Sequence, residues 1–171
     1  MWTKNSVDAV LKSYIDDKAR ALHLAIEIGE LEKRINAAVA SLASDEAGPG
    51  AQVITGMPHG TALSNPTEQI AVRLASGWVP PEIKEWKQDL AQKKEEHEAL
   101  TTKVRYVDAW MSALSDREHW IMLHQFIRGE FWRDIVTDYN AKFGGYVTKD
   151  TLKWLRGKAL KTIYAAAGIR N

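Results

Sequence analysis

The sequence predicts an all-α protein in which a long antiparallel helical hairpin, of the coiled-coil kind, precedes three shorter helices. Three observations support this prediction. Two long segments carry apolar residues at gaps of three and four. Glycines divide the last third of the chain into three short amphipathic segments. No alternation of apolar and polar residues reaches the length of a convincing strand.

The first long helix is predicted from about Asn5 to Leu42. This stretch contains no proline, and Gly29 is its one glycine. Its apolar side chains recur with the spacing of one face of a helix. The expected face consists of Val7, Leu11, Tyr14, Ala21, Ala25, Ile28, Ile35, Val39 and Leu42.

The second long helix is predicted from about Pro81 to Leu114. Its register of alternating three- and four-residue steps is unbroken, which is typical of a coiled-coil seam. Lys93 and His97 interrupt the apolar character, so we expect the seam to be weaker or open to water midway. The seam runs through Ile83, Trp86, Leu90, Lys93, His97, Leu100, Val104, Val107, Met111 and Leu114.

A segment rich in Gly and Pro, about residues 43–80, connects the two long helices. An antiparallel hairpin within one chain is the simplest packing, and a parallel homodimer is the competing arrangement. Within the connection, Asn-Pro-Thr-Glu at 65–68 predicts the start of a short helix that ends at Gly77. The Met-Pro-His-Gly sequence at 57–60 is either a loop that docks a partner or a packed turn.

Residues 1–114 therefore form the expected hairpin domain, and residues 115–171 form a second domain of three helices. Ser115 and Glu118 make a capping box at the start of the first of these helices. Thr148 is the expected cap of the last one. The helices should span about 116–128, 131–143 and 149–166, ended by Gly129, by Gly144-Gly145 and by Gly168. Their expected core contains Ile121, Leu123, Phe126, Ile127, Phe131, Trp132, Ile135, Val136, Tyr139, Leu152, Leu155, Leu160, Ile163 and Tyr164.

Charge is distributed unevenly along the chain, although its net value is only +1. Residues 1–114 hold 13 Lys and Arg against 16 Asp and Glu, a balance of −3, whereas residues 115–171 hold 10 against 6, a balance of +4. After Val147, six basic residues face Asp150 alone. Positive charge concentrated on one helix is typical of proteins that bind phosphate backbones, and it also occurs on solvated structural faces.

The residues that catalysis requires are largely missing from the sequence. There is no cysteine, which removes disulfides, thiolate metal sites and cysteine nucleophiles. The five histidines are scattered without a His-Glu-x-x-His pattern, and neither a Gly-rich phosphate loop nor a Gly-x-Ser-x-Gly elbow occurs. We therefore expect no enzyme, no metal and no cofactor. Because no signal peptide or membrane-length apolar run is present, we expect a cytoplasmic protein.

Three short amphipathic helices separated by glycine-containing turns match the helix-turn-helix plan, in which the last helix enters the major groove. The stretch VTKDTLKWLRGKALKTI, residues 147–163, resembles the recognition helix of region 4 of bacterial primary-type sigma factors without a gap. The preceding FWRDIVTDYNAKF stands where the supporting helix of that fold lies. The resemblance implies DNA binding, but Trp154 and Thr151 depart from the pattern, so it does not imply a preference for the −35 promoter element.

The expected hairpin, together with ITGMPHGTALSNPTEQ, is similar to the small phage regulators of the RinA and ArpU type. His59 and Asn65 depart from the usual residues of that family. The resemblance implies a phage or prophage activator that acts with host RNA polymerase on late or packaging genes in the bacterial cytoplasm. The expected partners are thus double-stranded DNA, RNA polymerase and, through the long helices, a second copy of the chain.

Each basic or hydroxyl side chain outside the Leu152 and Leu155 stripe has an expected role on DNA. Lys149 and Lys153 would reach base edges, and Thr148 and Thr151 would lie near a phosphate or a thymine methyl group. Arg156, Lys158 and Lys161 would contact phosphates, with Arg133 and Lys142 adding backbone contacts from the supporting helix. Trp154 is expected in the core or against a protein partner.

Two other functions fit the same pattern. A small terminase subunit also joins a helix-turn-helix to oligomerising helices, although such proteins tend to place the DNA-binding unit first. The other alternative is a coiled-coil interaction protein whose basic C-terminal helix is incidental. The oligomeric state and the effect of DNA on it distinguish these functions from a transcriptional activator.

Overall fold

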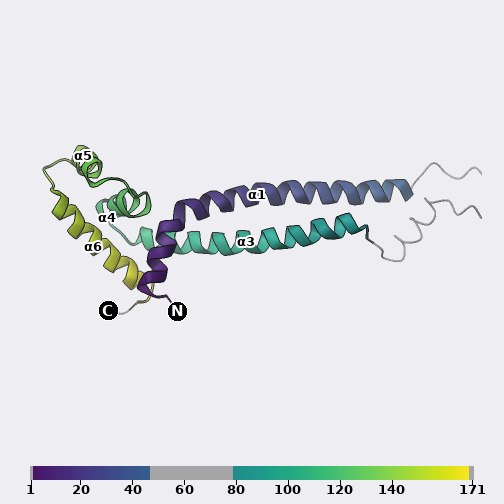
Figure 1. The fold of residues 1–171 in the computed structure, drawn as a ribbon, viewed down its shortest axis with the longest axis horizontal. Coiled ribbons are helices and arrows are strands. Elements are labelled where there is room, and N and C mark those ends of the chain that lie inside the picture. Colours follow the sequence, from purple (N-terminus) through teal and green to yellow (C-terminus); the bar gives the residue numbers. More distant parts are fainter. Residues whose placement is uncertain (1, 47–78, 170–171) are drawn as a thin grey trace, which may run out of the picture. The chain divides into compact units, whose positions relative to one another are not determined.

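The computed structural model describes residues 2–46 and 79–169, with side chains given for all of these except 42–46. Every regular element within these residues is a helix, which confirms the predicted all-α class (Figure 1). The short helix expected at 65–77 and the sequence at 57–60 lie outside the described residues. None of the described helices combines the length and the apolar character that crossing a membrane requires.

The first helix, α1 (Lys4–Glu46), is slightly longer at both ends than expected. Thr3 precedes it, and the Thr3 Oγ1 accepts a hydrogen bond from the N–H of Ser6 at 3.2 Å. In return, the Ser6 Oγ accepts a hydrogen bond from the N–H of Thr3 at 2.9 Å. These bonds satisfy amide groups that have no partner within the first turn of a helix.

The buried face of α1 departs from the prediction after Ala21. Leu24, which was not expected on this face, has no exposed surface. Ala25 and Val39 were expected to be buried, and both are exposed. Successive helical residues lie about 100° apart, so a face centred on Leu24 and Ile35 turns Ala25 toward solvent, whereas Val39 lies at the edge of this face and is 46% exposed.

The second long helix, α3 (Pro81–Ser112), begins with proline, which suits the first helical position because no amide hydrogen is needed there. Every expected seam position from Ile83 to Leu114 is buried or half-buried. Lys93 and His97 are among the half-buried positions. The three- and four-residue spacing therefore identified the inward face of α3 even where polar side chains occupy it.

The chain divides into two compact units, one of residues 1–23 and 96–171 and the other of residues 24–95. This division differs from the expected boundary between residues 114 and 115. The reason is a hydrophobic cluster in the first unit. The beginning of α1, the end of α3 and the C-terminal helices all contribute residues to it. Its buried members are Val7, Leu11, Val107, Trp110, Met111, Met122, Ile127, Ala159 and Ile163.

In the unit of residues 24–95, α1 and α3 run in opposite directions. The ammonium of Lys93 lies 3.1 Å from the carboxylate of Glu27. The guanidinium of Arg34 lies 4.1 Å from the centroid of the Trp86 ring. Paired positions thus rise along α1 while they fall along α3, which is the relation of antiparallel helices.

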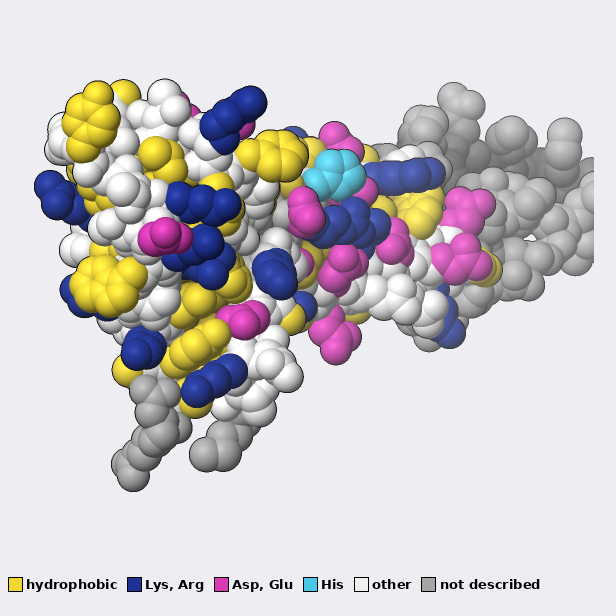
Figure 2. Space-filling view, turned by 60° about the vertical axis from the view of Figure 1, so that its left-hand side comes forward, with side chains coloured by type: hydrophobic (Ala, Val, Ile, Leu, Met, Phe, Trp, Pro, Cys, Tyr) yellow, Lys and Arg dark blue, Asp and Glu magenta, His cyan; other side chains and the backbone are white. Residues whose placement is uncertain are grey.

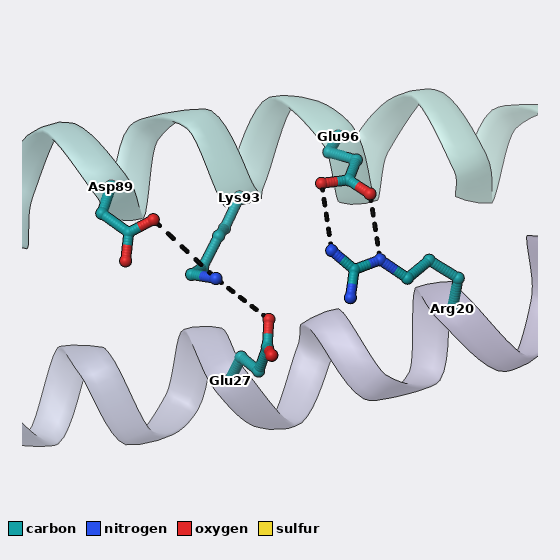
Figure 3. Close-up of polar contacts among 5 residues, drawn as sticks. All are labelled: Arg20, Glu27, Asp89, Lys93 and Glu96. Carbon is teal, nitrogen blue, oxygen red and sulfur yellow. Dashed lines mark hydrogen bonds and ion pairs between the residues drawn. The ribbon is translucent and has the colours of Figure 1, made fainter.

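Ion pairs accompany the seam in this unit. Lys93 reaches both Glu27 and, at 3.8 Å, Asp89 on its own helix (Figure 3). Lys94 lies 2.7 Å from Glu32. These side chains are at least a quarter exposed, so each pair stabilises the unit by at most about 1 kcal/mol. Their main effect is to favour one register of α1 against α3.

In the unit of residues 1–23 and 96–171, the same two helices are also joined by polar contacts. The guanidinium of Arg20 binds both carboxylate oxygens of Glu96, at 3.0 and 3.4 Å (Figure 3). The Tyr14 hydroxyl donates to Asp108 at 2.6 Å. Burial and this hydrogen bond raise the pKa of Tyr14.

Three C-terminal segments complete this unit: α4 (Asp116–Ile121) continued by the π-helical turn η1 (Met122–Ile127), then α5 (Trp132–Phe143), then α6 (Lys149–Ala166). The single regular helix expected at 116–128 is therefore only partly α-helical. A second cluster lies among these segments, with Trp120, Ile121, Ile135, Tyr139 and Leu152 buried in it.

The expected core of the three C-terminal helices needs one correction. Phe131 is 80% exposed, because it sits in extended backbone immediately before α5 and is not part of a helical face. Trp120 and Met122, which were not among the expected core residues, are buried instead. The other expected members are distributed between the two clusters.

Candidate nucleic-acid interface

The turn before α6 fixes where this helix starts. Gly144 and Gly145 adopt φ angles of +67° and +119°, which residues with a Cβ rarely tolerate. The Asn140 side chain then forms two hydrogen bonds with the backbone of Val147. Its Oδ1 accepts from the Val147 N–H at 2.9 Å, and its Nδ2 donates to the Val147 carbonyl at 3.2 Å. This side chain thereby connects the end of α5 to the start of α6.

Thr148 caps α6, as the sequence predicted. Its Oγ1 accepts a hydrogen bond from the N–H of Thr151 at 3.5 Å and lies 3.2 Å from the Thr151 hydroxyl. Both threonines are exposed at the start of the helix. The Thr148 hydroxyl therefore has a structural role in addition to any role at a ligand.

One face of α6 is buried in the unit. Leu152, Ala159 and Ile163 have no exposed surface, and Leu155 is half-buried beside them. Leu152 packs in the cluster of the C-terminal segments, while Ala159 and Ile163 pack in the cluster that includes the ends of the long helices. The opposite face of α6 is left exposed by this arrangement.

Glu118 connects α6 to the start of α4. Its Oε2 accepts hydrogen bonds from the Ser115 Oγ at 2.7 Å and from the Ser115 N–H at 3.1 Å, as expected of a capping box. The Lys158 ammonium forms an ion pair with Oε1 of Glu118 at 3.1 Å. Glu118 is buried, with 6% of its surface exposed, although charged residues are rarely buried unless they are paired.

These contacts determine the protonation of Glu118. Burial raises its pKa, but the hydrogen bonds from Ser115 and the positive charge of Lys158 lower it by more. The pKa of Glu118 consequently lies below its ordinary value. The carboxylate is therefore ionised at neutral pH and holds one of the expected phosphate-binding lysines by its charge.

Arg156, another expected phosphate contact, is half-buried. Its Nη1 donates to the Gln125 Oε1 at 2.9 Å, and its guanidinium lies 5.5 Å from the centroid of the Trp132 ring. Arg156 thus links α6 to η1 and α5. Its position favours a structural role over the phosphate contact expected from the sequence.

The remaining basic residues of α6 are exposed. Lys149 and Lys153 are four residues apart and therefore neighbours on one face. Lys153 lies 3.6 Å from Asp150, a pair too exposed to hold either side chain firmly. Lys161 is exposed two turns farther along.

The expected contacts of the supporting helix are also on the surface. Arg133, at the start of α5, lies 3.2 Å from Asp134, and its side chain is 92% exposed. Lys142, at the end of α5, lies 5.7 Å from the centroid of the Phe143 ring. Both side chains are therefore accessible to a ligand.

Trp154 is 67% exposed, so of its two expected places the core is wrong, and a contact with a protein partner stays a prediction. Tyr146, in the turn before α6, is also fully exposed. Figure 2 shows Lys and Arg side chains in dark blue beside hydrophobic side chains in yellow on the surface of this unit. The surface thus combines positive charge with aromatic side chains, which suits a polyanion with apolar groups.

Sequence reasoning missed several residues that position α6. Asn140 and Gln125 look like ordinary polar residues of amphipathic helices, and only the folded chain brings them to Val147 and Arg156. The capping-box spacing identified Glu118, but its contact with Lys158 joins positions far apart in the sequence. No local pattern signals such a contact.

Within residues 2–41 and 79–169, whose side chains the structure describes, no group of three or more His, Asp or Glu side chains is placed to hold a metal ion. Comparison with protein-family models, curated proteins and solved structures finds no match to the chain. The geometry of α6 and its surroundings is therefore the basis for assigning a function.

Proposed function

We propose that the chain is a DNA-binding transcriptional regulator that contacts double-stranded DNA with the exposed face of α6. The proposal rests on one observation, which is that the two faces of this helix differ in burial and charge. Leu152, Ala159 and Ile163 are buried on one side, while Lys149, Lys153 and Lys161 are exposed on the rest of its surface. Positive side chains on one helix complement the phosphates that border the major groove.

The surroundings of α6 support the same function. The turn after α5 is fixed by Asn140, and α6 is attached to α4 and η1 by Lys158 and Arg156. A recognition helix needs this support, because base edges are read by side chains in defined positions. Arg133 and Lys142 supply positive charge on the preceding helix. In this proposal Arg156 holds α6 in place, and the exposed lysines contact DNA.

The resemblance to phage regulators of the RinA and ArpU type extends the proposal to its biological setting. We infer an activator of late or packaging genes that acts with host RNA polymerase in the bacterial cytoplasm. The long helices α1 and α3 would serve contacts with protein, either polymerase or a second copy of the chain. Antiparallel pairing of these helices within one chain does not require a second copy.

Selection from a library of random-sequence duplexes tests DNA recognition directly. The full chain is incubated with the library at about 50 mM salt, where phosphate contacts are strong, and bound duplexes are sequenced over several rounds. We expect one sequence motif to be enriched. A footprint on the genome that encodes the chain should then fall upstream of an operon. Failure to retain any duplex at this salt concentration contradicts the proposal.

Native mass spectrometry of the full chain, with and without the selected duplex, separates this function from DNA packaging. We expect a monomer or dimer that binds one duplex. A closed ring of many subunits would support the small terminase alternative. A mass that the duplex leaves unchanged would support an interaction protein with an incidental basic helix.

A further inference from the structure

The outward face of α6 has an apolar centre. Buried residues Leu152, Ala159 and Ile163 define the inward direction of the helix. At about 100° per residue, Trp154 projects almost opposite to them, and it is 67% exposed. Neither hydrophobic cluster includes Trp154, so the packing of the fold does not account for this indole.

Gly157 lies three residues after Trp154, on the same face of the helix. Glycine is a poor residue for a helix interior, and here its backbone conformation does not require glycine. A Cβ added at Gly157 would meet nothing within 4 Å, so close packing does not require glycine either. The missing side chain instead leaves open space on this face of α6, one turn after Trp154, for an approaching molecule.

Lysines surround this apolar centre. Lys153 is adjacent to Trp154 in sequence, and Lys158 is one turn farther along α6. The side chains of these lysines are 47% and 58% exposed, and Lys158 is also paired with Glu118 at 3.1 Å. One acidic residue, Asp150, shares the face and lies 3.6 Å from Lys153. The positive surroundings favour a ligand that has negative charge around an apolar group.

Duplex DNA offers this combination at thymine. The C5 methyl group of thymine projects into the major groove between two phosphate backbones, and apolar side chains read it. Trp154 lies in the second turn of α6, near the helix end that enters the groove in helix-turn-helix proteins. A helix without a side chain at Gly157 can approach the base edges closely there.

We propose that Trp154, with the space left by Gly157, contacts a thymine methyl group in the major groove and thereby selects thymine at that base pair. This inference rests on the proposed DNA-binding function and adds a residue that determines sequence preference. Trp154 supplies the apolar contact, while the lysines around it neutralise phosphate.

The test uses the duplex that the full chain selects from the random-sequence library. A second duplex has deoxyuridine in place of every thymidine, which removes the methyl groups and keeps base pairing. The affinities of the unchanged chain and of Trp154→Ala are measured for both duplexes. Phe131→Ala is the matched control, since it removes an aromatic side chain that is 80% exposed and lies outside α6.

We expect the unchanged chain and Phe131→Ala to bind the deoxyuridine duplex about fourfold more weakly for each methyl group that Trp154 contacts, which is the effect of one buried methyl group. In Trp154→Ala this part of the thymine preference should be lost. Gly157→Gln should keep the helical circular dichroism signal and lose the preference for thymine, because its side chain fills the open space one turn after Trp154.

An equal thymine preference in Trp154→Ala and in the unchanged chain overturns this inference and leaves the DNA-binding proposal intact. If Trp154→Ala loses the preference and Gly157→Gln retains it in full, the Trp154 contact stands and the role of the space at Gly157 is rejected. If the unchanged chain binds no duplex, the DNA-binding proposal fails, and the thymine contact fails with it.

Discussion

The ammonium of Lys158 lies 3.1 Å from the carboxylate of Glu118, which is 6% exposed and also caps α4 through Ser115. This relation couples the exposed surface of α6 to the start of α4. A substitution at Lys158 therefore changes both the surface charge and the support of α6. Changes at Lys149 or Lys153 alter the surface charge alone and are cleaner tests of ligand binding.

Replacing Glu118 with Gln should destabilise the fold by about 1 kcal/mol at pH 7, the usual contribution of a helix cap. The pKa of Glu118 is lowered in the folded state, so its stabilising charge is fully present above the ordinary pKa of about 4.3 and is lost as pH falls through the folded value. Urea unfolding at pH 7 and pH 3 should show the difference between Glu118→Gln and the unchanged chain shrinking in acid.

Glu98→Gln, a change on the exposed surface of α3, is the control for Glu118→Gln. It should leave stability within about 0.5 kcal/mol of the unchanged chain, as most surface substitutions do. A destabilisation by Glu118→Gln that is the same at pH 7 and pH 3 would contradict the assigned charge of this carboxylate.

The Tyr164 hydroxyl donates to Asp8 at 2.7 Å, and burial together with this bond raises the pKa of Tyr164 to about 12. The ordinary tyrosine value is about 10, so the stabilisation is complete below pH 10 and decreases as pH rises toward 12. Between pH 9 and pH 11, the unchanged chain should lose more stability than Tyr164→Phe in denaturant unfolding.

Tyr146→Phe serves as the control in the alkaline experiment, because Tyr146 is fully exposed. The free energy of unfolding of Tyr146→Phe should match that of the unchanged chain at every pH. If Tyr164→Phe shows the same alkaline loss as the unchanged chain, the hydrogen bond to Asp8 does not stabilise the fold in solution.

Asn140→Ala removes both hydrogen bonds to the backbone of Val147. We expect a loss of about 1 to 3 kcal/mol, since two backbone groups lose their partners. The amide of Val147 should exchange with solvent deuterium faster than in the unchanged chain, which a hydrogen-exchange measurement detects. Asn36→Ala, on the exposed surface of α1, should leave this amide unaffected. An unchanged exchange rate of the Val147 amide in Asn140→Ala would contradict the role given to these two hydrogen bonds.

Two glycines should respond to alanine in opposite directions. Gly157→Ala should stabilise the fold by about 0.5 to 1 kcal/mol, because alanine favours the helix and its Cβ meets nothing within 4 Å. Gly144→Ala should destabilise it by about 1 kcal/mol or more, because φ is +67° there. Thermal unfolding compares the two, and equal shifts of Tm would contradict the backbone conformations described.

The sequence predicted those features that depend on neighbouring residues. The seam of α3 follows from apolar spacing, and the start of α6 follows from the preference of threonine for helix caps. The capping box at Ser115 and Glu118 is likewise local. Each of these signals lies within a few turns of one helix, where the sequence pattern and the structure are directly linked.

Features that depend on distant contacts were missed or misassigned. Val7 and Ile163 belong to one hydrophobic cluster although they lie near opposite ends of the chain, which is why the expected boundary at residue 115 does not separate the two units. Trp154 was expected in the core or against a partner, although helical periodicity alone places it almost opposite Leu152 and therefore away from the core.

The central claim is that the exposed lysines of α6 bind duplex DNA. Its most direct test compares the double substitution Lys149→Ala and Lys153→Ala with Lys84→Ala and Lys87→Ala, which removes the same charge from exposed positions of α3. Affinity for the selected duplex is measured between 50 and 200 mM salt.

We expect the α6 substitutions to weaken binding and to remove the sequence preference that base-edge contacts supply, with helicity unchanged, and to reduce the slope of log affinity against log salt concentration by about 0.9 for each of the two lysines that also neutralises a phosphate. The α3 substitutions should leave affinity and slope near those of the unchanged chain. Equal affinity and slope in both variants would contradict the assignment of α6 as the DNA-binding helix.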